Sequence, residues 1–212
     1  MNVLLHMCCG PCSVAVLEWL LGQGHEVTGF FFNPNIQPLA EYMRRREAAE
    51  EAARLYAIPI ILADTLPWEE QVWNDDCLAM YSDGEDNGLL EGLPPAVHPV
   101  PWLRMIHGRE FERCPLCWAS RLRKTADFAV SKGFEAFTST LLYSRYQNHA
   151  VLYDQCTTLA KEHSLTFIYH DFREFWQKGI ERSKELHLYR QPYCGCMLSE
   201  YERYAKKFRK RL

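Results

Sequence analysis

The sequence predicts an α/β protein: a Rossmann-like parallel sheet in a three-layer domain, with a cysteine-rich metal site at the carboxyl ends of the strands. Three observations predict this fold class. Strand and helix patterns alternate along most of the 212 residues, as they do in parallel sheets covered by helices. The apolar runs are short, as buried strands are. The group Cys8-Cys9-Gly10-Pro11-Cys12 directly follows the first expected strand, where such sheets bind ligands.

The first elements follow from apolar spacing and turn residues. Residues 2–7 form a short apolar run and are expected to be a buried strand. Residues 13–21 place apolar side chains at helical spacing, and Gly22 and Gly24 suit the end of that helix. A second strand is expected at residues 25–32.

The middle of the chain continues this alternation and then changes in composition. Residues 38–56 predict a strongly charged amphipathic helix, and residues 58–63 a third strand. A helix opening at Pro67 is expected over residues 67–81. Residues 82–101 are acidic and rich in Gly and Pro, which predicts a surface loop or insertion.

The second half returns to alternating strands and helices. Residues 114–132 predict a helix that stops at Gly133. The remaining strands are expected at 134–141 and 165–170, and the remaining helices at 149–163, 177–186 and 198–210. We therefore expect one domain over residues 1–212, with an insertion at 82–101 and a basic C-terminal helix at 198–212.

Charge and hydropathy narrow the function class. The net charge of −3 hides a basic C-terminal segment, because residues 197–212 carry +4 and the rest of the chain −7. That segment could contact phosphates, or it could be a solvated helix end with well-placed cations. No apolar run approaches the roughly 18 residues of a membrane helix, and the N-terminus lacks a signal-peptide pattern. We expect a cytoplasmic protein with no membrane partner.

The nine cysteines point to metal or thiol chemistry, because disulfides are rare in the reducing cytosol. Seven of them form three groups, which are Cys8, Cys9 and Cys12, then Cys114 and Cys117, then Cys194 and Cys196. Seven thiols exceed the four ligands of one structural zinc and suit a cluster plus a second centre. Zinc, an iron–sulfur cluster and thiol–disulfide exchange all stay open, because spacing does not identify the metal. Cys77 and Cys156 are expected in the core.

Several motifs in one order resemble the epoxyqueuosine reductase family QueH, along nearly the whole chain. The motifs are His6-Met7-Cys8-Cys9-Gly10-Pro11-Cys12, Phe31-Phe32-Asn33-Pro34-Asn35-Ile36-Gln37-Pro38, Arg113-Cys114-Pro115-Leu116-Cys117 with Arg121-Leu122, Phe137-Thr138-Ser139-Thr140-Leu141-Leu142, Asp171-Phe172-Arg173 and Tyr189-Arg190-Gln191-Pro192-Tyr193-Cys194-Gly195-Cys196. Several independent motifs are more specific than any single one.

The resemblance implies an adenine-nucleotide-hydrolase-like fold and an oxidoreductase that reduces epoxyqueuosine to queuosine at the wobble position of tRNA. It also implies a 4Fe–4S cluster beside a single iron held by two cysteines and an aspartate, and an external electron donor. The implied ligands are Cys8, Cys9, Cys12, Cys114, Cys117, Cys194 and Cys196, with no division between the two centres. For the aspartate, Asp64 and Asp171 both lie at expected strand ends, where each could instead be a helix cap or a loop carboxylate.

The reaction needs a proton donor and contacts to RNA. By position, Tyr193 and His6 are the candidate donors, although a buried structural role is the more common one for both residue types. Unpaired bases could stack on aromatic side chains or on arginine, or these aromatics could belong to the core. The candidate stacking partners are Phe32, Tyr143, Tyr146 and Arg190, and the candidate phosphate contacts are Arg44, Arg45, Arg46, Arg121, Arg123, Lys124 and the basic C-terminus.

Two other functions suit the fold and the cysteines. An ATP-dependent tRNA thiolation enzyme would need a Ser-Gly-Gly-x-Asp-Ser phosphate loop after the first strand. Here that position holds the first cysteine group, in which Pro11 removes a backbone N–H that could bind phosphate. A zinc-stabilised RNA-binding module would bind zinc tightly and bind RNA without turnover.

Overall fold

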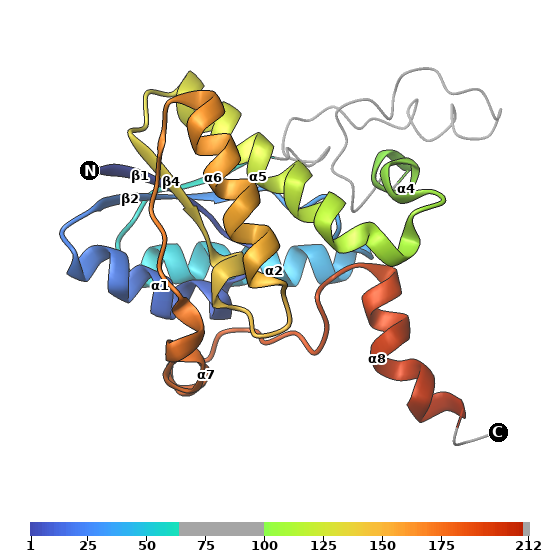
Figure 1. Cartoon of the computed structure of the whole chain (residues 1–212). Helices are drawn as coiled ribbons and strands as arrows, with labels where there is room; N and C mark the ends of the chain where they lie inside the picture. Colours follow the sequence, from blue (N-terminus) through green and yellow to red (C-terminus); the bar gives the residue numbers. More distant parts are fainter. Residues whose placement is uncertain (64–99, 210–212) are drawn as a thin grey trace, which may run out of the picture.

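The computed structural model describes residues 1–63 and 100–209 (Figure 1). Its sheet has five strands in the order β3-β2-β1-β4-β5, and every neighbouring pair is parallel. The strands are β1 (Asn2–His6), β2 (Glu26–Phe31), β3 (Ile60–Leu62), β4 (Ala136–Ser139) and β5 (Thr166–Phe167). Because β1 lies in the centre and pairs with β2 on one side and β4 on the other, the order reverses at β1. Ligands bind at such a switch point.

The helices form two layers on the sheet. They are α1 (Gly10–Gly22), α2 (Leu39–Leu55), α4 (Val100–Ile106), α5 (Arg113–Ser131), α6 (His149–His163), α7 (Trp176–Glu185) and α8 (Met197–Arg209). In Figure 1, α1, α2 and α7 cover one face of the sheet, and α5 and α6 cover the other. Three short 3-10 turns join them, which are η3 (Glu110–Glu112), η4 (Thr140–Tyr143) and η5 (Phe172–Phe175). The predicted three-layer α/β fold class is confirmed.

The first turn of α1 lies against the backbone of α2. A Cβ atom on Gly10 would collide with the carbonyl oxygen of Ala48, so only glycine allows this approach. Pro11 occupies the first turn of α1, where its missing N–H costs nothing. This junction fixes the start of α1, and with it the cysteines on either side of Gly10.

Most predicted elements are present, with shifted ends. The helix predicted at 149–163 is found with the same bounds, capped by Asn148 and ended by Ser164 in the left-handed conformation. The strand predicted at 134–141 ends at Ser139, whose side chain accepts a hydrogen bond from the Leu141 amide and so starts η4. The strand predicted at 165–170 keeps only Thr166–Phe167.

The predicted loop at 82–101 was too long at its end, because α4 already begins at Val100. The helix predicted at 67–81 and the rest of that loop lie outside the described residues, as does Cys77. Cys156 is fully buried in the core, as expected. None of the helices in the described ranges is long and apolar enough to cross a membrane.

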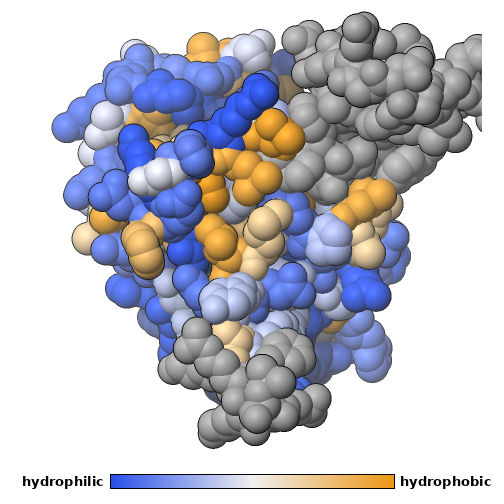
Figure 2. All heavy atoms as spheres, turned by 90° about the vertical axis from the view of Figure 1, so that its right-hand side faces the viewer, coloured by the Kyte–Doolittle hydropathy of each residue, from blue (hydrophilic) through white to orange (hydrophobic). Residues whose placement is uncertain are grey.

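The carboxyl ends of the strands point toward the side on which α5 and α8 begin (Figure 1). Figure 2 shows this side, where hydrophobic side chains interrupt a mostly polar surface. Its elements carry four of the exposed large hydrophobic side chains, Val100, Phe111, Met197 and Tyr201. An ion pair of 2.6 Å between Arg113 on α5 and Glu202 on α8 joins the two helices.

Candidate metal centre

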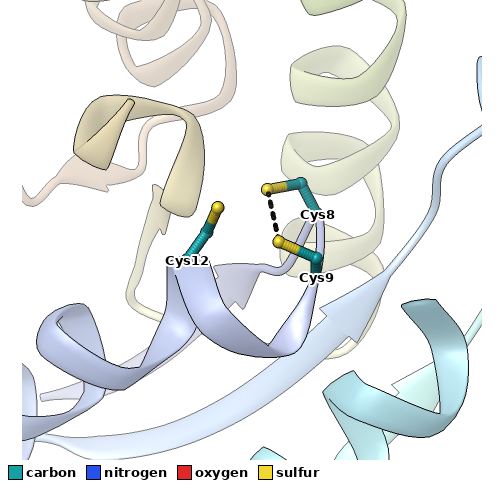
Figure 3. Close-up of side chains that lie close together, drawn as sticks. All are labelled: Cys8, Cys9 and Cys12. Carbon is teal, nitrogen blue, oxygen red and sulfur yellow. Dashed lines mark hydrogen bonds between the residues drawn. The ribbon is translucent and has the colours of Figure 1, made fainter. Parts of the chain in front are cut away.

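The first cysteine group lies at the carboxyl end of the central strand, between β1 and the first turn of α1. The sulfur atoms of Cys8, Cys9 and Cys12 lie within 4.8 Å of one another and point toward one another (Figure 3). Cys9 is fully buried, and the other two are partly buried. Thr140 on η4 fixes Cys8 at two points: its hydroxyl accepts from the Cys8 amide at 3.0 Å and donates to the sulfur at 3.2 Å.

The three thiols of this group differ in pKa. Hydrogen bonds from Cys12 and Cys9 hold the pKa of the Cys8 thiol well below its usual value, and nearby Arg121 and Thr140 act in the same direction. Burial raises the pKa of Cys9 to about 12. The pKa of Cys12 is raised because it donates to Cys8 and because it is buried. The group therefore favours one thiolate hydrogen-bonded by two thiols, which is a set of donors that a metal ion can deprotonate further.

The other four cysteines form a second group, from the start of α5 and the turn before α8. Cys117 and Cys196 are buried, Cys114 is partly buried and Cys194 is exposed. Burial raises the pKa of Cys114 and of Cys117, and negative charge on Cys194 and Cys196 raises both further. The thiols of one segment therefore lie near enough to those of the other to oppose their ionisation.

The turn that carries Cys194 and Cys196 is held by α2. The Arg45 guanidinium donates to the carbonyl oxygen of Cys194 at 2.6 Å and to that of Tyr193 at 3.0 Å. Its Nε donates to Glu41 at 2.7 Å. The Gln37 amide also donates to the Gly195 carbonyl at 3.1 Å, and Gly195 has φ 131° with little space beside it. Arg45 is only 2% exposed, so the phosphate contact expected of it is replaced by this internal role.

Arg121 and His6 lie beneath the cysteines, inside the fold. Arg121 is 2% exposed; its guanidinium donates to Asn33 Oδ1 at 2.7 Å and contacts the Cys117 sulfur at 3.9 Å. Its Nε lies 3.3 Å from His6 Nε2, and His6 Nδ1 lies 2.8 Å from the Ser139 hydroxyl. Burial, with the Arg121 charge, lowers the pKa of His6 to about 3. His6 is therefore neutral and enclosed, which suits positioning better than proton donation, and Arg121 lies too deep for the phosphate contact expected of it.

The other candidate residues lie partly at the surface and partly in the interior. The Tyr193 ring lies 5.5 Å from the Arg45 guanidinium, and burial raises its pKa to about 12. Arg190 is exposed, whereas Tyr143 is 3% exposed and donates to the Trp176 carbonyl at 2.9 Å. Both oxygens of Asp171, one of the two candidate aspartate ligands, accept from Arg173, at 2.7 and 2.6 Å. The alternative ligand, Asp64, lies outside the described residues.

Several residues of the site were not among the candidate site residues predicted from the sequence. Gln191 donates to the Cys9 sulfur at 2.8 Å, and its buried Oε1 has no hydrogen-bond partner among the described residues. Asn33 bridges Arg121 and the Met7 carbonyl. Trp176 lies beside Tyr143, with ring centroids 5.2 Å apart. Asn33 and Gln191 both lie within motifs that carry the family resemblance, and this is the signal that could have indicated them.

The donor set fits a metal centre. Three sulfurs face one point, four more come from two adjoining segments, and buried cationic side chains surround them. Thiolates with nearby positive charge suit zinc or an iron–sulfur centre, because both take soft sulfur ligands. The cysteine cluster can therefore hold a metal, and the geometry by itself does not choose which one.

Known proteins are similar to this chain over most of its length. A sequence profile described as Epoxyqueuosine reductase QueH matches residues 3–88 and 94–202. A protein of that name from Haemophilus influenzae is 35% identical over 204 residues, which cover 93% of this chain and 71% of the relative. Relatives of the same name from Thermotoga maritima and Dehalococcoides mccartyi are 32% and 30% identical, covering 97% of this chain and 93% and 96% of their own. The chain is an oxidoreductase that belongs to the epoxyqueuosine reductase QueH family.

Proposed function

We propose that the protein reduces epoxyqueuosine to queuosine at the wobble position of tRNA, in the cytoplasm, with electrons from an external donor. The reaction removes the epoxide oxygen as water and consumes two electrons and two protons. The observation that carries this proposal is the cluster of Cys8, Cys9 and Cys12 at the switch point of the sheet, in a chain of this family whose other four motif cysteines lie near enough to interact through their charges.

The two cysteine groups suggest how two metal centres would be held. The four thiols of α5 and of the turn before α8 match the ligand number of a 4Fe–4S cluster, and we assign Cys114, Cys117, Cys194 and Cys196 to it. Cys8, Cys9 and Cys12 would then hold a single iron beside it. When bound, the cluster would supply electrons one at a time, and the iron would supply a Lewis acid for the epoxide oxygen.

The side chains around these centres have separate tasks in the proposal. Thr140 fixes the Cys8 sulfur, and Gln191 does the same for Cys9. Arg45 positions the turn that carries Cys194. Tyr193 is the remaining candidate proton donor, because it is only partly buried and keeps its proton at neutral pH.

An aromatic surface beside the first cysteine group suits an unpaired base. Tyr146 is 85% exposed, its ring lies edge-on to Trp176 at 5.7 Å, and the Arg145 guanidinium lies 5.7 Å from the Trp176 ring. The same loop reaches both cysteine groups: burial and, next to it, negative charge on Cys12 and Cys9 raise the pKa of Tyr143, and Gln147 lies 3.6 Å from the Cys194 sulfur. Stacking on such rings is the usual way to hold a splayed RNA base.

The first experiment is anaerobic purification followed by iron and acid-labile sulfide analysis of one sample. About five iron and four sulfide per chain are expected for a 4Fe–4S cluster plus one iron. The same sample is then incubated with epoxyqueuosine-containing tRNA and a strong reductant, and the digested nucleosides are measured by mass spectrometry. Zinc without labile sulfide, even after reconstitution, would contradict the proposal and favour the zinc-stabilised RNA-binding module.

Single Cys→Ala variants test the assignment of ligands. Loss of any of Cys114, Cys117, Cys194 or Cys196 is expected to remove the sulfide together with four iron, whereas loss of Cys8, Cys9 or Cys12 is expected to remove about one iron. The matched control is Cys156→Ala, because Cys156 is buried in α6, away from both groups, and should leave iron and sulfide unchanged. ATP hydrolysis that depends on added tRNA would instead support a thiolation enzyme.

A further inference from the structure

Arg121 is a buried cation that the structure does not pair with an acid. It is among the largest fully enclosed side chains, at 2% exposure, on the face of α5 that packs on the sheet. Its oxygen partner is a neutral amide, Asn33 Oδ1 at 2.7 Å. Its Nε lies 3.3 Å from the His6 imidazole, which carries no acidic group. None of the described carboxylates forms an ion pair with it.

An enclosed guanidinium of this kind is costly unless negative charge lies nearby. Desolvating an ion costs several kcal/mol, and removal of its partner leaves that cost uncompensated. Arg45 shows the usual arrangement in the same molecule, since it is equally buried but forms an ion pair with Glu41 at 2.7 Å. Among the described residues, the ionisable acidic groups that interact with Arg121 are thiols. Cys117 lies 3.9 Å away, and Cys8 and Cys194 interact with the same charge.

We propose that Arg121 is the fixed counter-charge of the cysteine site: its guanidinium, 3.9 Å from the Cys117 sulfur, compensates the negative charge of the metal-bound thiolates. This inference rests on the proposed function. Because reduction adds negative charge to the centre, a fixed cation beside it stabilises the reduced state and makes the reduction potential less negative. Arg121 is thus a positioning residue that acts through the cysteines, and it does not contact the substrate.

The Asn33 amide completes this arrangement without cancelling the charge. Its Oδ1 accepts from Arg121 while its Nδ2 donates to the Met7 carbonyl at 2.9 Å, one residue before Cys8. An aspartate would have almost the same shape but would pair with the guanidinium. The choice of an amide therefore leaves the positive charge available to the cysteines.

The test compares variants that differ in charge. The midpoint potential of the bound centre is measured by redox titration followed with electron paramagnetic resonance, and the iron and sulfide content of each variant is measured as well. Arg121→Gln removes the charge, and Arg121→Lys keeps it. The matched control, Arg123→Gln, makes the same charge change on the same helix, at an exposed side chain 3.1 Å from Glu162. We expect Arg121→Gln to reduce the equilibrium constant for one-electron reduction at least tenfold. This corresponds to a midpoint potential about 59 mV more negative than that of wild type. Arg121→Lys should retain most of the wild-type potential, and the control should match wild type.

A second pair of variants tests the charge without removing the arginine, in case Arg121→Gln fails to fold. Asn33→Asp supplies a carboxylate to Arg121 and should also make the potential more negative. Asn33→Ser loses the same hydrogen bond to Met7 without adding charge, and should shift the potential less than Asn33→Asp does.

The outcomes separate this inference from the proposed function. A wild-type sample that holds iron and sulfide, with Arg121→Gln at the wild-type potential, overturns the counter-charge alone. Equal shifts in Arg121→Lys and Arg121→Gln would also overturn it, because shape and not charge would then matter. A wild-type sample that holds only zinc overturns the proposed function; the counter-charge is then tested by chelator competition, in which Arg121→Gln must lose zinc faster than Arg123→Gln.

Discussion

At the scale of single residues, the site depends on groups that allow close approach or fix a charge. Gly10 brings α1 against α2, Thr140 holds Cys8, and Arg121 supplies a buried positive charge. Each acts through one or two atoms, so single substitutions separate their roles. By contrast, Asp171 is occupied by Arg173 and lies outside this network.

Gly10→Ala is expected to destabilise the protein by about 2–3 kcal/mol, because the new Cβ would collide with the Ala48 backbone and force α1 away from α2. Urea unfolding measures this change. The matched control is Gly22→Ala at the other end of α1, where a Cβ meets no atom within 4 Å. That variant should be neutral or slightly more stable, as alanine usually is in a helix. Equal losses in both variants would contradict the steric explanation.

Asp171→Asn tests whether this carboxylate is a metal ligand or an ordinary ion pair. Hydrogen bonds from Arg173 lower the pKa of Asp171 to about 2, so its ionised form stabilises the fold above the unfolded-state pKa near 4. That contribution is lost as pH falls toward 2, and it is at most about 1 kcal/mol because the pair is exposed. We expect wild-type iron content and a small loss of stability at pH 7 that disappears near pH 2. Loss of iron would restore Asp171 as a ligand.

At the scale of elements, two segments far apart in sequence are joined by a few polar contacts. The loop after β2 and helix α2 hold the turn before α8: Arg45 binds two of its carbonyl oxygens and Gln37 a third. Glu41 keeps Arg45 in place and also accepts from the Tyr189 hydroxyl at 2.5 Å. The position of Cys194 and Cys196 therefore depends on α2 as much as on their own segment.

Arg45→Met is expected to reduce stability by roughly 3–5 kcal/mol, because Glu41 would be left buried without its partner, and to reduce the iron content. The double variant Glu41→Gln/Arg45→Met should recover much of the stability but not the iron content, because no side chain replaces Arg45 at the turn that carries Cys194 and Cys196. Thermal unfolding and iron analysis of the same preparations measure both. Full recovery of iron in the double variant would show that the arginine does not position the cysteines.

At the scale of the whole molecule, the proposed centre ties three regions together. Its ligands come from the β1–α1 turn, from α5 and from the turn before α8. A centre shared by such distant segments couples metal binding to folding, because the ligands converge only in the folded chain.

Removal of the metal is therefore expected to lower the melting temperature by several degrees or more, since bound metal stabilises only the folded state. Calorimetry before and after anaerobic chelation measures the difference. Cys156→Ala should show the same dependence on metal as wild type, and Cys117→Ala a smaller one. If chelation leaves the melting temperature of wild type unchanged, the cysteines do not link the three regions through a metal.

The proposed RNA binding also belongs to the whole molecule, because it would use the aromatic surface beside the first cysteine group. Tyr146→Ala is expected to weaken binding of an anticodon stem-loop about 5- to 100-fold, which is the range for loss of one stacking contact. Its salt dependence should stay unchanged, because no charge is removed. Fluorescence anisotropy at several salt concentrations measures both. The control is Tyr153→Ala on α6, a 42% exposed tyrosine whose ring lies edge-on to Tyr169, and it should bind normally.

The sequence by itself determined the α/β alternation, the helix at 149–163 and the cysteine groups, because these are local patterns of spacing and turn residues. Motif order also determined the family. It did not determine which cysteines meet, or that Arg45 and Arg121 are buried rather than placed toward phosphates. Only the tertiary structure decided these points, because a charged residue in a helix reads as solvated until the partners beyond that helix are known. Arg45 pairs with Glu41 one helical turn away, but it also binds the Tyr193 carbonyl, which lies 148 residues further along the chain. Arg121 binds Asn33, which lies 88 residues away.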